Sequence, residues 1–123
     1  AINLFERWFA GLQLIGKKIA PLTHNGVFDL SHIQAFLGQA SYSEKFQTSE
    51  VRDTMYLARS MNDLADHKLQ NFPYPKVDLK FLCICTGVDS EKYGKRHSAF
   101  VDALLTAEVY AAMMHKLKMN STL

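Results

Sequence analysis

The stretch that decides the fold is residues 17–37, which read KKIAPLTHNGVFDLSHIQAFL. Its first part, Lys17 to Thr23, is a short apolar run of strand length, although Pro21 cannot donate a hydrogen bond to a neighbouring strand. From Phe28 the apolar residues recur at three- and four-residue steps, which predicts a helix that ends at Gly38. A strand that opens into a helix is typical of α/β folds, and we expect this class.

Length and composition limit the classes of protein that fit. The chain has 123 residues, the size of one domain, and we expect a single domain over residues 1–123. With 48% apolar and 21% charged residues it matches globular proteins, and a net charge of +2 does not by itself indicate a nucleic-acid or membrane protein. No apolar run is long enough to span a membrane, and Glu6 and Arg7 stand where a signal peptide would be apolar. Two cysteines cannot form a disulfide framework, so we expect a cytoplasmic protein.

The rest of the chain is predicted mainly helical. We expect one more short strand, and surface connections at residues 39–49 and 89–96 and around the prolines at 71–75. The predicted elements are a helix over 2–15, a strand over 17–23, a helix over 28–37, a strand over 50–54, and helices over 55–69, 77–86 and 98–118. Two strands are fewer than a self-supporting sheet normally has, so either strands remain unrecognised or part of the sheet lies outside this sequence.

One candidate site residue lies at the end of the first predicted strand. There His24-Asn25-Gly26-Val27-Phe28-Asp29 leads into a helix. Ligands and catalytic groups collect at the carboxyl ends of parallel strands, which makes the Asp29 carboxylate a candidate. The alternative is that Asp29 only caps the helix or lies in its first turn, where a carboxylate is favoured without any further function.

A second candidate pair is His97 and Asp102. Five residues is not a same-face spacing on a helix, so we expect His97 just before the last helix and Asp102 within its first turns. A histidine can take a proton from water near neutral pH, and a carboxylate binds hard cations through oxygen. A single spacing of this kind also arises by chance.

Taken together and in order, these motifs resemble a known family. The strings HNGVFDLSHIQAFL (24–37), RDTMYLARSM (52–61) and KRHSAFVDALLTAEVYAAMM (95–114) resemble the DEDDh family of 3′ to 5′ exonucleases, which includes the DnaQ-like proofreading subunits. Asp29 then matches the second exonuclease motif, although His32-Ile33 departs from its usual ending. His97 and Asp102 match the third motif, and the Asp-Thr string matches the usual connector.

The resemblance implies a ribonuclease-H-like α/β fold and a metal-dependent hydrolysis. It implies that two divalent cations, Mg²⁺ or Mn²⁺, are held with the help of Asp29 and Asp102, and that His97 is the general base. The implied substrate is the 3′ end of single-stranded DNA, with RNA as the other candidate. Asn25, Phe28 and Arg96 are then candidate substrate-binding residues, while core packing for Phe28 and a solvated loop for Lys92, Lys95 and Arg96 are the simpler interpretations.

One departure from the family is large. The family begins with a strand that carries an Asp-x-Glu pair, and we expect this chain to be the C-terminal part of such a domain, with the first strands missing. The pair Asp89-Ser90-Glu91 lies in a charged loop on no apolar strand, and we interpret it as a solvated loop. A polymerase or a second chain is then the partner that would supply the missing motif.

Two other interpretations compete with catalysis by this chain. A degenerate exonuclease fold can survive as a binding or assembly module, and the missing first motif favours that alternative. A zinc site built from Cys83, Cys85, His67 and His97 is the other, but the two cysteines are closer together than the usual zinc pair and lie in an apolar helical run.

Overall fold

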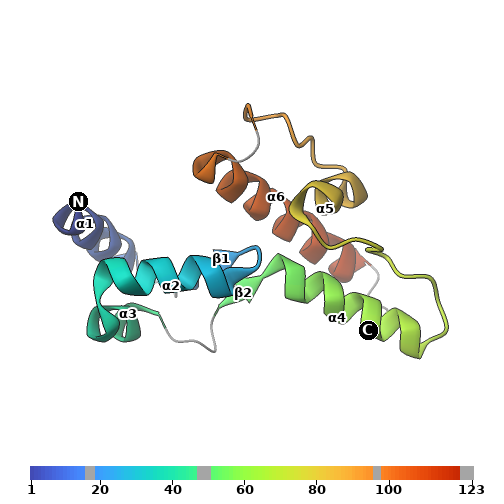
Figure 1. The fold of residues 1–123 in the computed structure, drawn as a ribbon, viewed down its shortest axis with the longest axis horizontal. Coiled ribbons are helices and arrows are strands. Elements are labelled where there is room, and N and C mark those ends of the chain that lie inside the picture. The colour runs from blue at the N-terminus through green and yellow to red at the C-terminus, as the bar shows by residue number, and fades with distance from the viewer. Residues whose placement is uncertain (16–18, 47–50, 96–97, 120–123) are drawn as a thin grey trace. The chain divides into compact units, whose positions relative to one another are not determined.

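The computed structural model describes residues 1–15, 19–46, 51–95 and 98–119, without the side chains of Val27 and Phe28. In this part of the chain the order of elements is α1, β1, α2, α3, β2, α4, α5 and α6 (Figure 1). The chain divides into two compact units. The first contains residues 1–22 and 26–52, and the second contains residues 23–25 and 53–123.

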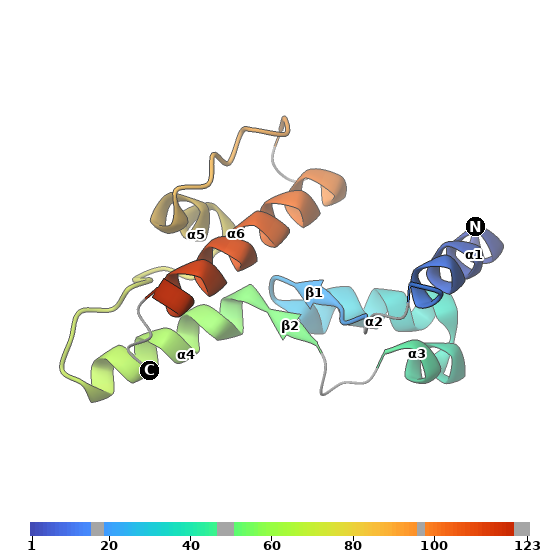
Figure 2. The same cartoon turned by 180° about the vertical axis from the view of Figure 1, so that it is seen from behind.

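The sheet consists of two short parallel strands, β1 (Leu22–Thr23) and β2 (Arg52–Asp53), which Figure 2 shows side by side. The strand predicted over residues 17–23 is therefore confined to its last two residues within the described part, and residues 17 and 18 lie outside it. Pro21 is tolerated because its carbonyl, which proline retains, accepts a hydrogen bond from the Arg52 N–H at 2.8 Å. The second predicted strand shortens because Thr54 already begins a helix.

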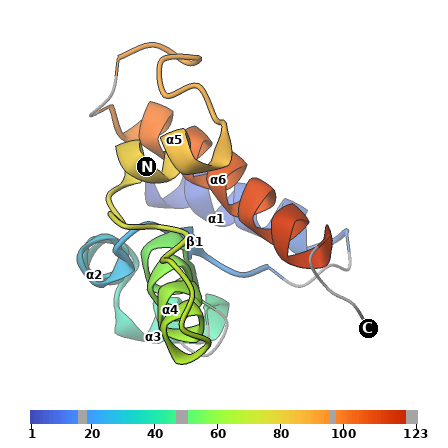
Figure 3. The same cartoon turned by 90° about the vertical axis from the view of Figure 1, so that its right-hand side faces the viewer.

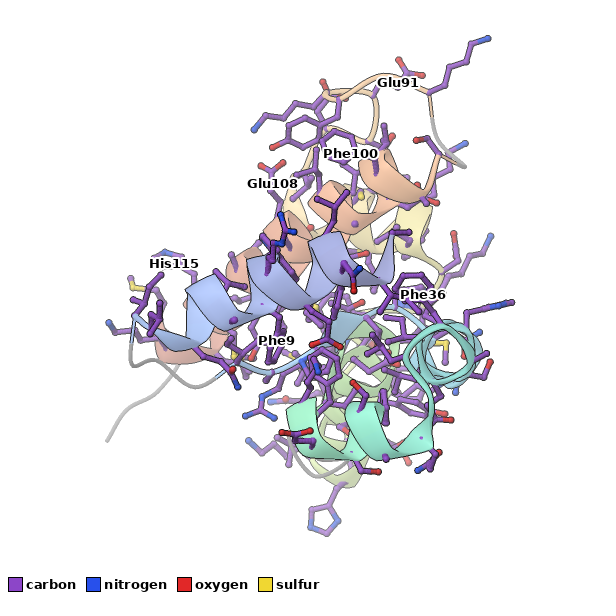
Figure 4. All side chains as sticks on the ribbon, turned by 90° about the vertical axis from the view of Figure 1, so that its left-hand side faces the viewer. Phe9, Phe36, Glu91, Phe100, Glu108 and His115 are labelled. Carbon is purple, nitrogen blue, oxygen red and sulfur yellow. The ribbon has the colours of Figure 1, made fainter. Side chains whose placement is uncertain are left out.

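The first unit packs three helices around an aromatic core. These are α1 (Ile2–Gln13), α2 (Gly26–Leu37) and α3 (Gln39–Lys45). Phe9 of α1 is buried with Tyr42 and Phe46, and the Phe46 ring meets the Phe9 ring edge-on with 5.3 Å between centroids. In Figure 4 Phe9 lies on the side of α1 that faces α3.

Helix α3 corrects the prediction that residues 39–49 form a surface connection, of which residues 47–49 lie outside the described part. Only Tyr42 and Phe46 are bulky and apolar in this stretch, but they are one helical turn apart and both are buried against Phe9. Gly38 separates α3 from α2 with φ of 84°, a positive value that glycine adopts without the steric cost of a Cβ. Two apolar side chains are too few to reveal this helix by periodicity.

A polar cluster also joins α3 to α1. The Lys45 ammonium lies 2.8 Å from one carboxylate oxygen of Glu6, and the Ser41 hydroxyl donates to the other at 3.3 Å. The hydrogen bond from Lys45 is the main cause that lowers the pKa of Glu6 below its ordinary value. The Lys45 side chain is largely buried, with its ammonium 5.8 Å from the centre of the Phe9 ring.

The second unit contains the larger core and three helices, α4 (Thr54–His67), α5 (Leu79–Thr86) and α6 (Ala99–Met119). Helices α5 and α4 both pack on α6, and Figure 3 shows α5 against α6. The buried apolar side chains of α6 recur every four residues, which places them on one stripe that faces the other helices. These apolar residues are Val101, Leu105, Val109 and Met113, and the polar Thr106 is buried beside them in the sequence.

Local signals fix the ends of α5 close to the predicted positions. The Asp78 carboxylate accepts a hydrogen bond from the Phe81 N–H at 3.2 Å and caps the start. Gly87, with φ of 77°, ends the helix in the left-handed conformation. The predicted helices over residues 2–15, 55–69 and 98–118 likewise match α1, α4 and α6 to within a few residues at each end.

Tyr74 lies in the core of the second unit, and its hydroxyl has no hydrogen-bond partner among the described residues. Burial, followed by the charge of Cys85, raises the pKa of this phenol above its ordinary value of 10.0. The folded chain therefore keeps the proton that the unfolded chain loses near that pH, so this contribution to stability is complete below pH 10 and falls as the pH rises further.

We expect Tyr74→Phe to remove this alkaline loss while changing the free energy of unfolding at pH 7 by less than about 1 kcal/mol, because no hydrogen bond is lost. Urea unfolding at pH 7 and at pH 11 measures both effects. A variant whose stability falls between these pH values as steeply as that of the wild type would contradict the assignment to Tyr74.

Among the residues that the structure describes, no helix is both long enough and apolar enough to span a membrane.

Candidate functional site

The turn between β1 and α2 carries the first group of predicted site residues. β1 ends at Thr23 and α2 begins at Gly26, so His24 and Asn25 form the connection. Asn25 has φ of 61°, which is the left-handed region that residues other than glycine rarely adopt and that asparagine adopts more readily than most. The side chain of Asn25 is exposed and that of Thr23 is buried.

The Asp53 carboxylate, at the end of β2, organises this turn. Its Oδ1 accepts hydrogen bonds from the N–H groups of Met55 at 2.9 Å and Tyr56 at 3.3 Å, which caps the start of α4. The same oxygen accepts from the Asn25 N–H at 3.1 Å, and Oδ2 accepts from the Thr23 hydroxyl at 3.2 Å. One side chain thus connects a helix start to a turn about 30 residues earlier in the sequence.

Thr54 binds the middle of the same turn. Its hydroxyl lies 2.8 Å from Nδ1 of His24 and also donates to the Thr23 carbonyl at 3.4 Å. The hydroxyl has a single proton, so when that proton points at the carbonyl, His24 is the donor at Nδ1. Thr54 is fully buried, which shields these contacts from water.

Asp29, the first predicted ligand, lies in the first turn of α2 with its side chain exposed. This is the position that both the catalytic and the helix-capping interpretations require, because the helix dipole favours a carboxylate there. Phe28 precedes it in the same turn, but the Phe28 side chain lies outside the described part of the chain.

Asp102, the second predicted ligand, lies in the first turn of α6 as expected, with its side chain partly exposed. Its backbone N–H donates to the Ser98 carbonyl at 2.9 Å, and its carbonyl accepts from the Thr106 hydroxyl at 2.7 Å. His97 and Arg96 lie outside the described residues, so the placement of the base and of the third substrate residue stays a prediction.

The two aspartates belong to different units, Asp29 to the first and Asp102 to the second. Within the described residues, no three histidine, cysteine, aspartate or glutamate side chains form a group that could hold a metal ion. The donor chemistry of the two aspartates, which offers carboxylate oxygens alone, fits a hard cation such as Mg²⁺ or Mn²⁺.

The loop before His97 combines an ion pair with an open cavity. The Lys92 ammonium binds the Glu108 carboxylate of α6 at 2.9 Å. This hydrogen bond raises the pKa of Lys92. Hydrogen bonds from Tyr93, the larger cause, and from Lys92 lower the pKa of Glu108. Figure 4 shows Glu108 and Glu91 in this region. Lys92 is thus already paired with a carboxylate, which weakens its candidacy as a phosphate ligand.

A cavity of about 840 Å³ separates the start of α5 from this loop, and it is lined by both Lys95 and Glu91.

The Asp-x-Glu string at residues 89–91 forms a local turn. The Glu91 N–H donates to the Asp89 carboxylate at 3.0 Å, and both acidic side chains are exposed. The interpretation of this string as a solvated loop is confirmed. Cys83 is buried in the core of the second unit, Cys85 is partly buried, and neither forms a disulfide among the described residues.

The sequence prediction missed the role of Asp53 and Thr54, which it treated only as a connector between motifs. An aspartate before an amphipathic run is a recognisable helix cap. The hydrogen bonds from Asp53 to Thr23 and Asn25 have no signature in the sequence, because they depend on β1 and β2 pairing across 30 residues.

Comparison of the chain with known protein families, with curated proteins and with solved structures gives no match.

Proposed function

We propose that this chain carries the second and third motifs of a metal-dependent 3′ to 5′ exonuclease that releases nucleoside monophosphates from single-stranded DNA. One observation supports this proposal most. Asp29 and Asp102 each lie in the first turn of a helix; the helix of Asp29 follows β1 after the two-residue turn, and Asp102 comes five residues after His97 in the sequence. These are the local positions that the motif resemblance requires of two metal-binding carboxylates.

In this proposal Asp29 and Asp102 would hold the cations, which would stabilise the charge that builds on the phosphate oxygens and would make a water molecule easier to deprotonate. His97 takes the proton from that water, as a histidine can near neutral pH. The water oxygen then bonds to phosphorus, and the bond from phosphorus to the 3′ oxygen of the preceding nucleotide breaks. That oxygen takes up a proton and leaves a new 3′ hydroxyl on the strand.

The remaining predicted residues would position the strand. The exposed amide of Asn25 can donate to and accept from the terminal nucleotide, Arg96 can bind a phosphate, and Phe28 can stack on a base. The family resemblance also calls for an Asp-x-Glu pair. The exposed turn at residues 89–91 is a poor candidate for it, so a second polypeptide is proposed to supply that pair.

The test is the release of mononucleotides from a single-stranded oligonucleotide labelled at its 3′ end, with Mn²⁺ or with EDTA, and with an RNA of the same sequence in parallel. We expect slow release with Mn²⁺ and none with EDTA, because the chain alone lacks the Asp-x-Glu pair that a second polypeptide is proposed to supply. An oligonucleotide blocked by a 3′ phosphate is the control, because an enzyme that recognises a free 3′ end should degrade it more slowly. A chain that binds the oligonucleotide but releases nothing would favour the non-catalytic binding module. A chain that neither binds nor cleaves would overturn the proposal.

A further inference from the structure

The turn that carries Asn25 is fixed by side chains from another part of the sequence. Thr23 at the end of β1 and the two residues of the turn, His24 and Asn25, are each hydrogen-bonded to Asp53 or Thr54. Such bonds connect positions 28 to 31 residues apart, so they order a segment that has no regular secondary structure of its own.

Helix capping does not account for this arrangement. A cap on α4 needs only the hydrogen bonds from Met55 and Tyr56, which an aspartate or a serine at position 53 can accept equally well. The Asp78 carboxylate shows the simpler case, because its one side-chain hydrogen bond goes to its own helix, α5. Asp53 in addition accepts the Asn25 N–H and the Thr23 hydroxyl, which uses both carboxylate oxygens.

We propose that Asp53 is a positioning residue that holds Asn25 in its left-handed conformation and so presents the Asn25 side chain to the nucleotide substrate, an inference that rests on the proposed function. The backbone N–H of Asn25 is the group through which Asp53 acts. Asn25 has φ of 61°, a conformation that an unrestrained turn would adopt for only a small part of the time. The hydrogen bond to Asp53 stabilises this conformation. Loss of the carboxylate is therefore expected to weaken substrate binding more than the chemical step.

Asp53→Ser in the full chain separates the two roles of the residue. Serine keeps the cap on α4 but cannot also reach Thr23 and Asn25. We expect hydrogen exchange of the Asn25 amide to become at least about tenfold faster, as for an amide that loses its local protection. We expect KM for the oligonucleotide to rise about tenfold, which is the loss of affinity expected when one hydrogen bond is removed, and kcat to change much less. Asp78→Ser, the same substitution at the cap of α5, should change neither quantity.

A double-mutant cycle tests whether Asp53 acts through Asn25. Asn25→Ala should raise KM by itself, and adding Asp53→Ser to it should raise KM no further, because the side chain to be positioned is already gone. Thr23→Val, which removes a single hydroxyl from the cluster, should show a smaller increase in both exchange and KM and serves as the second variant if Asp53→Ser does not fold.

Two results would overturn the inference: an unchanged exchange rate of the Asn25 amide in Asp53→Ser, or additive effects of the two substitutions on KM. Failure of the proposed function looks different, because the wild-type chain would then neither bind nor degrade the oligonucleotide. In that case the substrate role of Asp53 falls with it, while the exchange rates still show whether the carboxylate holds the turn.

Discussion

Replacing Asp102 with alanine is expected to lower the rate of nucleotide release by a factor of about 1,000 or more, which corresponds to roughly 4 kcal/mol of lost transition-state stabilisation. The proposed role explains the size of the effect. A carboxylate that holds a cation beside the scissile phosphate acts on charge that develops in the transition state, and alanine offers no oxygen in its place. His97→Ala should cause a comparable loss if that side chain is the base.

The fold is expected to survive this substitution. Asp102 is partly exposed in the first turn of α6, next to the buried Val101, and its described backbone bonds to Ser98 and Thr106 do not involve the carboxylate. Alanine is also the best helix former, and loss of the favourable interaction of the carboxylate with the helix dipole costs about 0.3–1 kcal/mol. Unchanged circular dichroism and a small change in the urea midpoint would separate loss of chemistry from loss of structure.

Asp63→Ala is the matched control, because it removes an exposed aspartate from another helix of the same unit. It should leave nucleotide release near the wild-type rate. Near-normal release by Asp102→Ala would show that the carboxylate is not a cation ligand. A shift in the Mn²⁺ concentration needed for half-maximal rate, measured with the milder variant Asp102→Asn, would tie any remaining effect to the cation.

How far the sequence predicts this fold differs between its elements. The stripe of Val101, Leu105, Val109 and Met113 repeats every four residues, so periodicity alone identifies α6. The short α3 was missed because its burial depends on Phe9, which lies more than 30 residues earlier in the chain. The strand pair was overestimated in length because an apolar run is consistent with an extended conformation whether or not a partner strand is present.

The candidate site also contains residues whose positions the local sequence predicts and residues whose roles it does not predict. The first-turn positions of Asp29 and Asp102 follow from where each helix begins, which is a local property of the sequence. The function of Asp53 depends on hydrogen bonds to Thr23 and Asn25, which local patterns do not encode. Asn62 belongs to the same group, because a polar residue in the middle of an amphipathic helix is normally assigned to the exposed side, whereas the structure buries it.

The second large effect is expected from Asn62→Ala, which should lower the free energy of unfolding by about 2–4 kcal/mol. Asn62 lies in α4, and its amide makes two hydrogen bonds to the backbone of Tyr74. Nδ2 donates to the Tyr74 carbonyl at 2.7 Å, and Oδ1 accepts from the Tyr74 N–H at 3.0 Å. Alanine would leave both buried backbone groups without these partners.

The neighbouring prolines make this pair of bonds hard to replace. Tyr74 stands between Pro73 and Pro75, neither of which has an N–H, so Tyr74 supplies the only backbone donor of this tripeptide. Its fully buried ring belongs to the core cluster with Leu82 and Leu105, and Asn62 therefore anchors the segment between α4 and α5 to the core. A loss of about 2–4 kcal/mol would remove a large fraction of the stability of a small domain.

Two further variants identify the cause of the loss. Asn71→Ala removes an exposed asparagine from the same segment and should stay within about 0.5 kcal/mol of the wild type. Asn62→Asp keeps the acceptor for the Tyr74 N–H but turns a second oxygen toward the Tyr74 carbonyl, so it should be destabilised at pH 7 and recover part of the loss at acid pH, where a protonated carboxyl can donate to that carbonyl. Urea unfolding of the three variants at pH 7 and pH 4 measures these effects. Equal stability of Asn62→Ala and the wild type would mean that water replaces both hydrogen bonds to Tyr74 and that the Tyr74 backbone is accessible to solvent.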